Sequence, residues 1–221
     1  MLRYPCLVLD HDDTVVRSEA TVNYPAFLEA LRVLRPGVTV SLRDFSLWTF
    51  REGFLGMCAN HFGFHTDEEY EVQYRIWLDY VMEHIPPAHA GIGRILERQR
   101  QAGGLICVSS HSARGNILRD YETHFGIVPD RIFGWELGPE LRKPAPYALD
   151  CLMAEYKLSP SDILMVDDLN TGYDMAQARG VDFAWAGWGR SNMPEIAASM
   201  EGRGKFSFRT TQELESMLFG S

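Results

Sequence analysis

Acidic, hydroxyl and amino side chains follow short apolar runs at widely separated points of the chain. They are Asp10, Asp12, Ser109, Ser110, Lys143, Asp167 and Asp168. Carboxylate oxygens suit a hard divalent cation such as Mg²⁺, and hydroxyls and a lysine ammonium suit a phosphate. An aspartate can also attack phosphorus and carry the phosphoryl group. Gathered at one point, these residue types would serve phosphoryl transfer.

The apolar runs that precede these residues are typical of buried parallel strands. With one further run near the C-terminus, they are residues 6–9, 105–108, 131–133, 163–166 and 183–185. Helix-like spacing lies between the later runs, so we predict an α/β fold with a Rossmann-like, doubly wound parallel sheet. Ligands bind beyond the carboxyl ends of such strands, and the polar residues that follow the runs should therefore meet there.

Asp10 and Asp12 lie two residues apart at the end of the first run. In an extended segment, residues i and i+2 point the same way. Two crowded carboxylates need a cation between them or a raised pKa on one of them. One could attack phosphorus, while the other protonates the leaving oxygen and then deprotonates water. The alternative is that both acids simply end a strand in a polar turn.

Ser109, Ser110, Lys143, Asp167 and Asp168 complete the set. A serine hydroxyl with neighbouring backbone N–H groups can bind a phosphoryl oxygen, although serines also form turns. A lysine binds phosphate as a point charge, although most lysines are solvated. Adjacent acids that close an apolar strand are costly unless they bind a metal or gain several donors. The whole pattern is more specific than any one member, because every member falls at a predicted strand end.

A long segment after the first strand interrupts the alternation of strands and helices and is mostly helical in pattern. Thr66 and Glu69 form a capping-box pattern ahead of one apolar helix face. Since the segment follows the first strand, we expect it to lie above the carboxyl end of that strand as a cap. The predicted domains are a helical cap at residues 17–86 and a catalytic core at residues 1–16 and 87–221.

Trp48 and Arg51 are the cap's candidate substrate contacts. They lie in an aromatic stretch, residues 47–54, where an arginine could meet an anionic or planar leaving group. The alternative is that the aromatic side chains form the cap's own core and that Arg51 pairs with a nearby acid.

Composition narrows the range of functions. The 221-residue chain has a net charge of −9, so nucleic-acid binding is not expected. No apolar stretch reaches the length of a membrane span, and Asp10 cuts the first apolar run short, so neither membrane insertion nor a signal peptide is expected. The four cysteines lack metal-ligand spacing and are expected to be reduced thiols in a cytoplasmic protein. Composition does not indicate the oligomeric state.

The motifs together resemble those of the haloacid dehalogenase-like hydrolase superfamily. The resemblance is to the phosphatase branch, in which a helical cap is inserted after the first motif. It spans nearly the whole chain. The matching motifs are Asp10-His11-Asp12-Asp13-Thr14, Ser109, Lys143-Pro144-Ala145-Pro146 and Val166-Asp167-Asp168, with Gly180 at the helix end that usually follows the fourth motif.

This resemblance implies a role for each matching residue. Asp10 would be the nucleophile and a Mg²⁺ ligand. Asp12 would be the general acid/base, with its backbone carbonyl on the metal. Ser109 and Lys143 would bind the phosphoryl group, and the two acids of the fourth motif would complete the metal site.

Two positions depart from the family pattern. Asp13 stands where the family usually has glycine, and Gly172 stands where many members have a further aspartate, with Asp174 nearby. Two other branches of the family fit less well. Asp12 argues against dehalogenation, because that branch lacks an aspartate there. The segment Val22–His84 contains no lysine, which argues against the phosphonate-cleaving branch, because that branch uses a cap lysine.

We therefore expect a Mg²⁺-dependent phosphatase that acts on a small phosphorylated metabolite through an aspartyl-phosphate. The alternative within the same chemistry is a phosphomutase, which returns the phosphoryl group to a sugar. A phospho-receiver domain uses similar residue types, but its acidic pair comes first and it does not need Asp12. A binding protein without catalytic activity is the remaining alternative.

Overall fold

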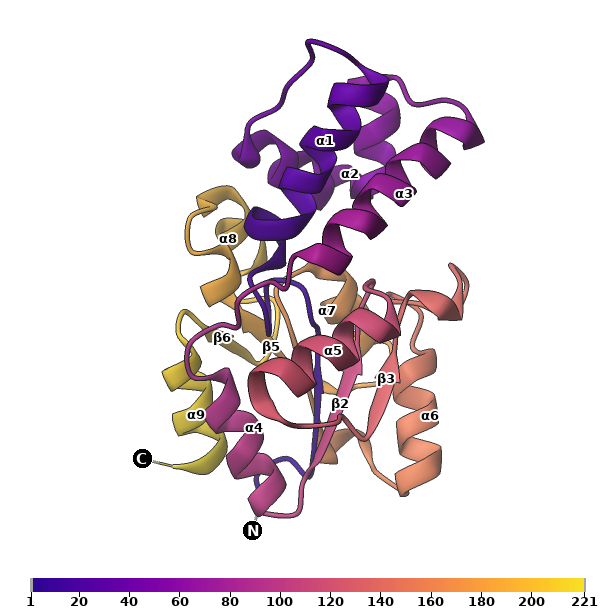
Figure 1. The fold of residues 1–221 in the computed structure, drawn as a ribbon. Helices are drawn as coiled ribbons and strands as arrows, with labels where there is room; N and C mark the ends of the chain where they lie inside the picture. The colour runs from indigo at the N-terminus through magenta and orange to yellow at the C-terminus, as the bar shows by residue number, and fades with distance from the viewer. Residues whose placement is uncertain (1, 221) are drawn as a thin grey trace. The chain divides into compact units, whose positions relative to one another are not determined.

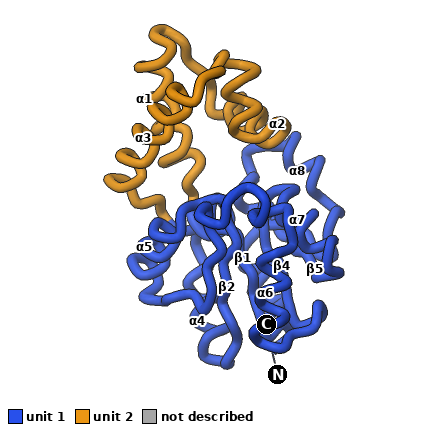
Figure 2. The backbone as a smooth tube through the Cα atoms, turned by 90° about the vertical axis from the view of Figure 1, so that its right-hand side faces the viewer, with its two compact units in different colours: residues 1–16, 88–221 blue, residues 17–87 orange. Residues whose placement is uncertain are grey.

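The computed structural model describes residues 2–220, which divide into two compact units (Figure 2). The α/β unit comprises residues 1–16 and 88–221, and the helical unit comprises residues 17–87. The backbone leaves the α/β unit after its first strand and returns to it once the helical unit is complete. Each unit has its own hydrophobic core.

Within the described residues, the α/β unit forms one parallel sheet of six strands (Figure 1). In chain order these are β1 (Cys6–Leu9), β2 (Leu105–Ser109), β3 (Arg131–Phe133), β4 (Ile163–Asp167), β5 (Asp182–Ala186) and β6 (Phe206–Phe208). Their order across the sheet is β3-β2-β1-β4-β5-β6. The predicted Rossmann-like sheet is confirmed, and β1 to β5 match the five apolar runs. β6 was not predicted, because its three residues are half-buried or exposed and form no apolar run.

The register of the central strands brings their carboxyl ends level with one another. Leu9 of β1 lies opposite Val108 of β2 and Val166 of β4. The next residue, Asp10, donates its backbone N–H to the carbonyl of Val166, with an N···O distance of 2.9 Å. The residues that follow these three strands therefore emerge side by side at one edge of the sheet.

Helices cover both faces of the sheet. In chain order they are α4 (Ile92–Gln101), α5 (Arg114–Phe125), α6 (Tyr147–Tyr156), α7 (Asn170–Gln177), α8 (Pro194–Met200) and α9 (Thr211–Phe219). Apolar side chains of α4, α5 and α9 join those of the central strands in one core, and Figure 2 shows α6 and α7 on the opposite face from α4 and α5. Among residues 2–220, no helix is both long and apolar enough to cross a membrane.

The helical unit is built around an aromatic core. Its helices are a π-helical turn η1 (Glu19–Asn23), α1 (Tyr24–Leu34), α2 (Leu42–Phe62) and α3 (Asp67–Glu83). Phe27 of α1 is fully buried, and its ring contacts those of Phe45, Phe54, Phe62 and Phe64 at centroid distances of 5.0–6.4 Å. Offset and edge-on ring pairs of this kind add to the stability that burial itself provides.

Local sequence signals set the helix boundaries in this unit. The predicted capping box starts α3: the Thr66 side chain accepts from the Glu69 N–H, and the Glu69 carboxylate accepts from the Thr66 N–H. Pro25 lies in the first turn of α1, where its missing N–H is harmless. Gly53 interrupts α2 with φ 72° and ψ 164°, a conformation that favours glycine.

Candidate active site

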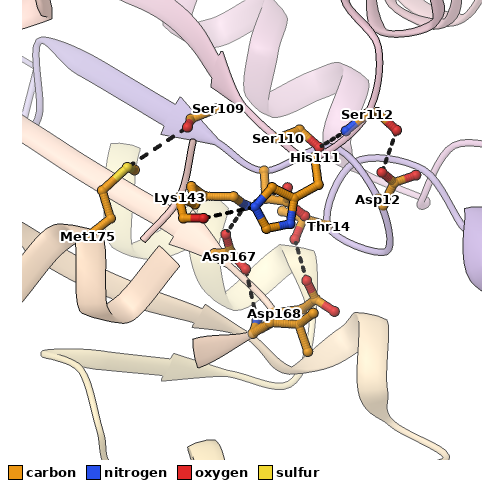
Figure 3. A network of polar contacts seen from close by, with 12 residues as sticks. Asp12, Thr14, Ser109, Ser110, His111, Ser112, Lys143, Asp167, Asp168 and Met175 are labelled. Atoms are coloured by element: carbon orange, nitrogen blue, oxygen red, sulfur yellow. Dashed lines mark hydrogen bonds and ion pairs between the residues drawn. The ribbon is translucent and has the colours of Figure 1, made fainter. Parts of the chain in front are cut away.

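Polar side chains from four segments of the α/β unit meet at the carboxyl ends of the central strands (Figure 3). The predicted site residues that the structure brings together there are Asp10, Asp12, Ser109, Ser110, Lys143, Asp167 and Asp168. The two predicted cap residues, Trp48 and Arg51, belong to the helical unit.

Lys143 is a buried cation held between two acids. Its Nζ lies 2.7 Å from Oδ1 of Asp10 and 2.5 Å from Oδ2 of Asp167. Burial alone would lower the pKa of Lys143, but the charges of Asp10 and Asp167 outweigh burial and raise the pKa above its usual range. The ammonium is therefore permanently charged at neutral pH, next to the residue that sequence analysis predicts to be the nucleophile.

Asp10, Asp167 and Asp168, here called the acid triad, are three buried carboxylates. One oxygen of each lies within 4.8 Å of one oxygen of the other two. Burial raises the pKa of Asp167; Lys143 opposes this shift, and Asp10 and Asp168 add to it. Burial also raises the pKa of Asp168, against the effect of Arg190. Three carboxylates that each offer an oxygen at this spacing fit a hard divalent cation such as Mg²⁺.

Asp12 is held in place by a residue that sequence analysis did not single out. The Ser112 hydroxyl, in the loop after β2, donates to Oδ2 of Asp12 at 2.5 Å. Asp12 is only half-buried, so its carboxylate keeps access to solvent. The sequence signal was present, because Ser112 belongs to the same hydroxyl-rich stretch as Ser109 and Ser110.

The two predicted phosphate-binding serines have different surroundings. The Ser109 hydroxyl makes a long contact of 3.9 Å with Sδ of Met175, and a phosphoryl oxygen would be a far better acceptor. Ser110 uses its groups within the protein: its N–H donates to the Phe133 carbonyl, and its hydroxyl accepts from the N–H of Ser112. Ser109 therefore has the more available hydroxyl, and Ser110 shapes the loop.

Arg190 is a second buried cation at the site, which sequence analysis also missed. Its Nε donates to Oδ2 of Asp168 at 2.6 Å, and its Nη2 lies 3.4 Å from Oδ2 of Asp13. Arg190 lies after β5, in a short 3₁₀ turn, η4 (Gly187–Arg190). The sequence carried no signal for its role, because only the folded chain brings this turn to the site.

The two departures from the family pattern have physical explanations. Asp13 has a φ of 55°, in the left-handed region, which aspartate tolerates better than most residues. At Gly172, a Cβ atom would overlap the side chain of Asp167, so α7 has no room for a further aspartate there. The nearby Asp174 is exposed and lies outside the acid triad.

His11 ties the loop that carries the first motif to α5. Its Nε2 lies 3.0 Å from Oδ2 of Asp120, and both side chains are buried. Its ring stacks with that of Tyr121 at a centroid distance of 6.0 Å. No local sequence pattern links Asp120 or Tyr121 of α5 to the first motif.

In the helical unit, Trp48 and Arg51 lie on α2. The ring of Trp48 stacks on that of His61, 3.8 Å between centroids and 8° between planes. Nε2 of His61 lies 2.8 Å from Oε1 of Glu52. Arg51 is exposed. The stack shows that Trp48 has a packing partner in its own unit, so its role toward substrate stays a prediction.

Comparisons with known proteins bear on the fold. No protein-family model matches the chain, and no curated protein matches it. Solved structures do. A protein from Lactobacillus delbrueckii subsp. bulgaricus named as a phosphoglycolate phosphatase superimposes with a TM-score of 0.80 and 17% identity, over 99% of this chain and 100% of that chain. CbbY from Rhodobacter sphaeroides gives a TM-score of 0.74 and 15% identity, over 97% and 96% of the two chains.

A third structure, from Bacteroides fragilis, is named as a haloacid dehalogenase-like hydrolase. It has a TM-score of 0.71 and 18% identity, over 82% of this chain and 87% of that chain. The chain has the fold of the haloacid dehalogenase-like hydrolases. The TM-scores show that the fold is shared. At identities this low the activity does not follow from the fold and has to be argued from the side chains of this protein.

Proposed function

We propose that the protein is a Mg²⁺-dependent phosphatase that hydrolyses a small organic phosphate monoester through an aspartyl-phosphate. The observation that carries the proposal is the contact of the Lys143 ammonium with Asp10 inside the acid triad. It puts a nucleophile, a cation for the phosphate charge and the oxygens for a metal ion in one buried group. A merely polar turn would not need three buried acids and a buried lysine, which are costly to desolvate.

In the proposed reaction, a carboxylate oxygen of Asp10 attacks phosphorus as the bond to the leaving oxygen breaks. Lys143, already 2.7 Å from Oδ1 of Asp10, would stabilise the charge on the phosphoryl oxygens, and the Ser109 hydroxyl would donate to them. Asp12 would protonate the leaving oxygen and then accept a proton from the water that attacks the aspartyl-phosphate. The hydrogen bond from Ser112 would keep Asp12 oriented for both transfers.

The acid triad would hold the Mg²⁺, with the backbone carbonyl of Asp12 as a further ligand. When bound, the ion would neutralise negative charge between the carboxylates and the phosphate. Without this neutralisation, the crowded aspartates would repel an anionic substrate.

The substrate we propose is a small phosphorylated metabolite. CbbY was solved with phosphate, and another structure of that protein was solved with xylulose-1,5-bisphosphate. We propose that the helical unit acts as the cap domain that selects the substrate, with Trp48 and Arg51 as its candidate contacts. Cys6, Cys58, Cys107 and Cys151 are free thiols, as suits a reducing cytoplasm.

The test is a turnover screen of the purified protein against a panel of phosphate monoesters with Mg²⁺ present. We expect release of inorganic phosphate, loss of turnover in a strong chelator and recovery when Mg²⁺ is restored. Ca²⁺ should restore little, because its larger and looser shell would misplace the nucleophile. Full activity in chelator would contradict the metal assignment. Conversion of a sugar phosphate into its isomer without phosphate release would identify a phosphomutase instead.

A further inference from the structure

The turn after β5 runs against the loop that carries the first motif. The indole Nε1 of Trp188 donates to the carbonyl of Thr14 at 3.0 Å. At Gly189, a Cβ atom would overlap the carbonyl of Asp13, so only glycine lets the two backbones approach this closely. The two contacts bring the next residue, Arg190, to the acids of the site.

Arg190 is 5% exposed and lies between two carboxylates. Its Nε donates to Oδ2 of Asp168 at 2.6 Å, a short charge-assisted hydrogen bond. Its Nη2 forms a longer ion pair, 3.4 Å, with Oδ2 of Asp13. The distances make Asp168 the stronger partner and Asp13 a second anchor for the guanidinium.

Asp168 is thereby held through both of its oxygens. Oδ2 accepts from Arg190, and Oδ1 accepts from the Thr14 hydroxyl at 3.4 Å. The indole of Trp185 fixes the backbone at the same residue by donating to the Asp168 carbonyl at 3.1 Å. A carboxylate fixed in this way has little freedom to turn away from Asp10 and Asp167.

We propose that Arg190, anchored by Asp13, is a positioning residue that orients Asp168 as a metal ligand. This inference rests on the proposed function, because it presumes that the acid triad binds a divalent cation. It also gives Asp13 a purpose at a position where glycine would satisfy the backbone: its carboxylate secures the guanidinium that secures Asp168.

If Arg190 acted only through its charge, its removal would change the metal affinity in the opposite direction. If Arg190 only neutralised negative charge, its removal would make the site more negative, and a divalent cation would bind more tightly. If Arg190 orients Asp168, its removal frees a ligand, and the cation binds more weakly. Partners that orient metal ligands typically contribute about 10- to 100-fold in affinity.

The experiment is calorimetric titration of the metal-free protein with Mn²⁺, without substrate. We expect Arg190→Met to weaken Mn²⁺ binding by at least about tenfold. Arg190→Lys keeps the charge but loses the fixed fork of donors, and it should weaken binding to an intermediate degree. Arg209→Met removes a surface arginine that pairs with the exposed Glu201, and it should leave Mn²⁺ affinity unchanged.

A combined variant distinguishes the orientation of Asp168 from the net charge of the site. Asp13→Gly together with Arg190→Met restores the original net charge and leaves a glycine at the left-handed position. It should bind Mn²⁺ as weakly as Arg190→Met alone, since Asp168 remains unheld, and it removes the buried carboxylate that could prevent the single variant from folding. If Arg190→Met or the combined variant binds Mn²⁺ as tightly as the unmodified protein, or more tightly, the inference is overturned. Failure of the unmodified protein to bind Mn²⁺ would overturn the proposed metal site, and this inference with it.

Discussion

The acid triad of the α/β unit and Glu69 of the helical unit place carboxyl groups in opposite kinds of environment. At the candidate site, the α/β unit buries the acid triad, with burial raising the pKa of two of its members. In the helical unit, Glu69 lies at the start of α3, where N–H groups of His65 and Thr66 and the guanidinium of Arg35 lower its pKa to about 2. The charged form of the carboxyl group is thus disfavoured at Asp167 and Asp168 and favoured at Glu69.

The difference shows where the molecule gives up stability. The helical unit places Glu69 where the helix N-terminus and Arg35 favour its charge, and keeps its core aromatic. The α/β unit places like charges close together among buried side chains, where Lys143 and Arg190 offset them. Arrangements of the second kind are typical of functional sites, because charges placed for chemistry are seldom placed for stability.

The largest expected effect comes from removing the central cation of the α/β unit. Lys143→Met should reduce turnover to background and lower the free energy of unfolding by about 3 kcal/mol in chelator, because it leaves buried acids without their partner. Mg²⁺ should recover part of that stability. Chemical denaturation with and without chelator measures both. The control is Lys205→Met, whose exposed lysine pairs with Asp182 at 2.6 Å and should matter little. Equal losses of unfolding free energy in the two variants would contradict the expectation that the buried ion pair contributes more than the exposed one.

The next effect distinguishes Asp12 from the acid triad. Asp12→Asn keeps the proposed nucleophile but removes the proton donor and base. Hydrolysis of alkyl phosphates should fall roughly 10²–10⁴-fold, because a poor leaving group needs protonation. The first step with an aryl phosphate should be nearly unaffected. Pre-steady-state release of the phenol measures that step, and an equal loss of rate for both leaving groups would rule out the acid role.

A smaller effect is expected from the residue that holds Asp12. Ser112→Ala removes the 2.5 Å hydrogen bond but leaves every proposed reacting group in place. We expect alkyl phosphate turnover to fall about tenfold, corresponding to a loss of about 1.4 kcal/mol, with a smaller loss on aryl phosphates. Steady-state kinetics on the two substrate types provides the test. A change in KM alone would point to substrate binding instead.

The smallest effect on activity is expected in the helical unit. Thr66→Ala removes the cap of α3 and should lower the free energy of unfolding by about 1 kcal/mol. Turnover of a small aryl phosphate should be unchanged.

Glu69 of the same capping box should make the stability of the helical unit depend on pH. Because the pKa of Glu69 is lower in the folded state, its ionised form adds stability above its ordinary pKa of 4.5, and this contribution is lost as the pH falls toward 2. Denaturation across that range should show a shallower pH dependence for Glu69→Gln. If the stability of Glu69→Gln and that of the unmodified protein depend on pH in the same way, Glu69 is not stabilised by the groups around it.

The parts of the molecule that sequence predicted are those with local signals. β1 to β5 are apolar runs, and the Thr66–Glu69 capping box lies within four residues, so each could be recognised in isolation. The start of α7 at Asn170 has no such signal, because the residue before it, Leu169, makes no side-chain capping hydrogen bond.

The contacts that sequence could not predict join distant segments. Ser112 reaches Asp12 from the loop after β2, and Arg190 reaches Asp168 from the turn after β5. These pairings depend on the order of strands across the sheet, which brings loops together irrespective of their separation in the chain. The apolar runs indicated β1 to β5, and only the assembled sheet shows which side chains support the aspartates.

The most direct test of the account is mass spectrometry of the Asp12→Asn protein after addition of an aryl phosphate and Mg²⁺. Asp10 should still attack, because a phenolate leaves without protonation, whereas breakdown should be slow without a base for water. The account predicts a protein that gains one phosphoryl group, and no gain when Asp10→Asn is added to the same variant. If the phosphoryl group still accumulates without Asp10, another residue is the nucleophile and the proposed mechanism is wrong.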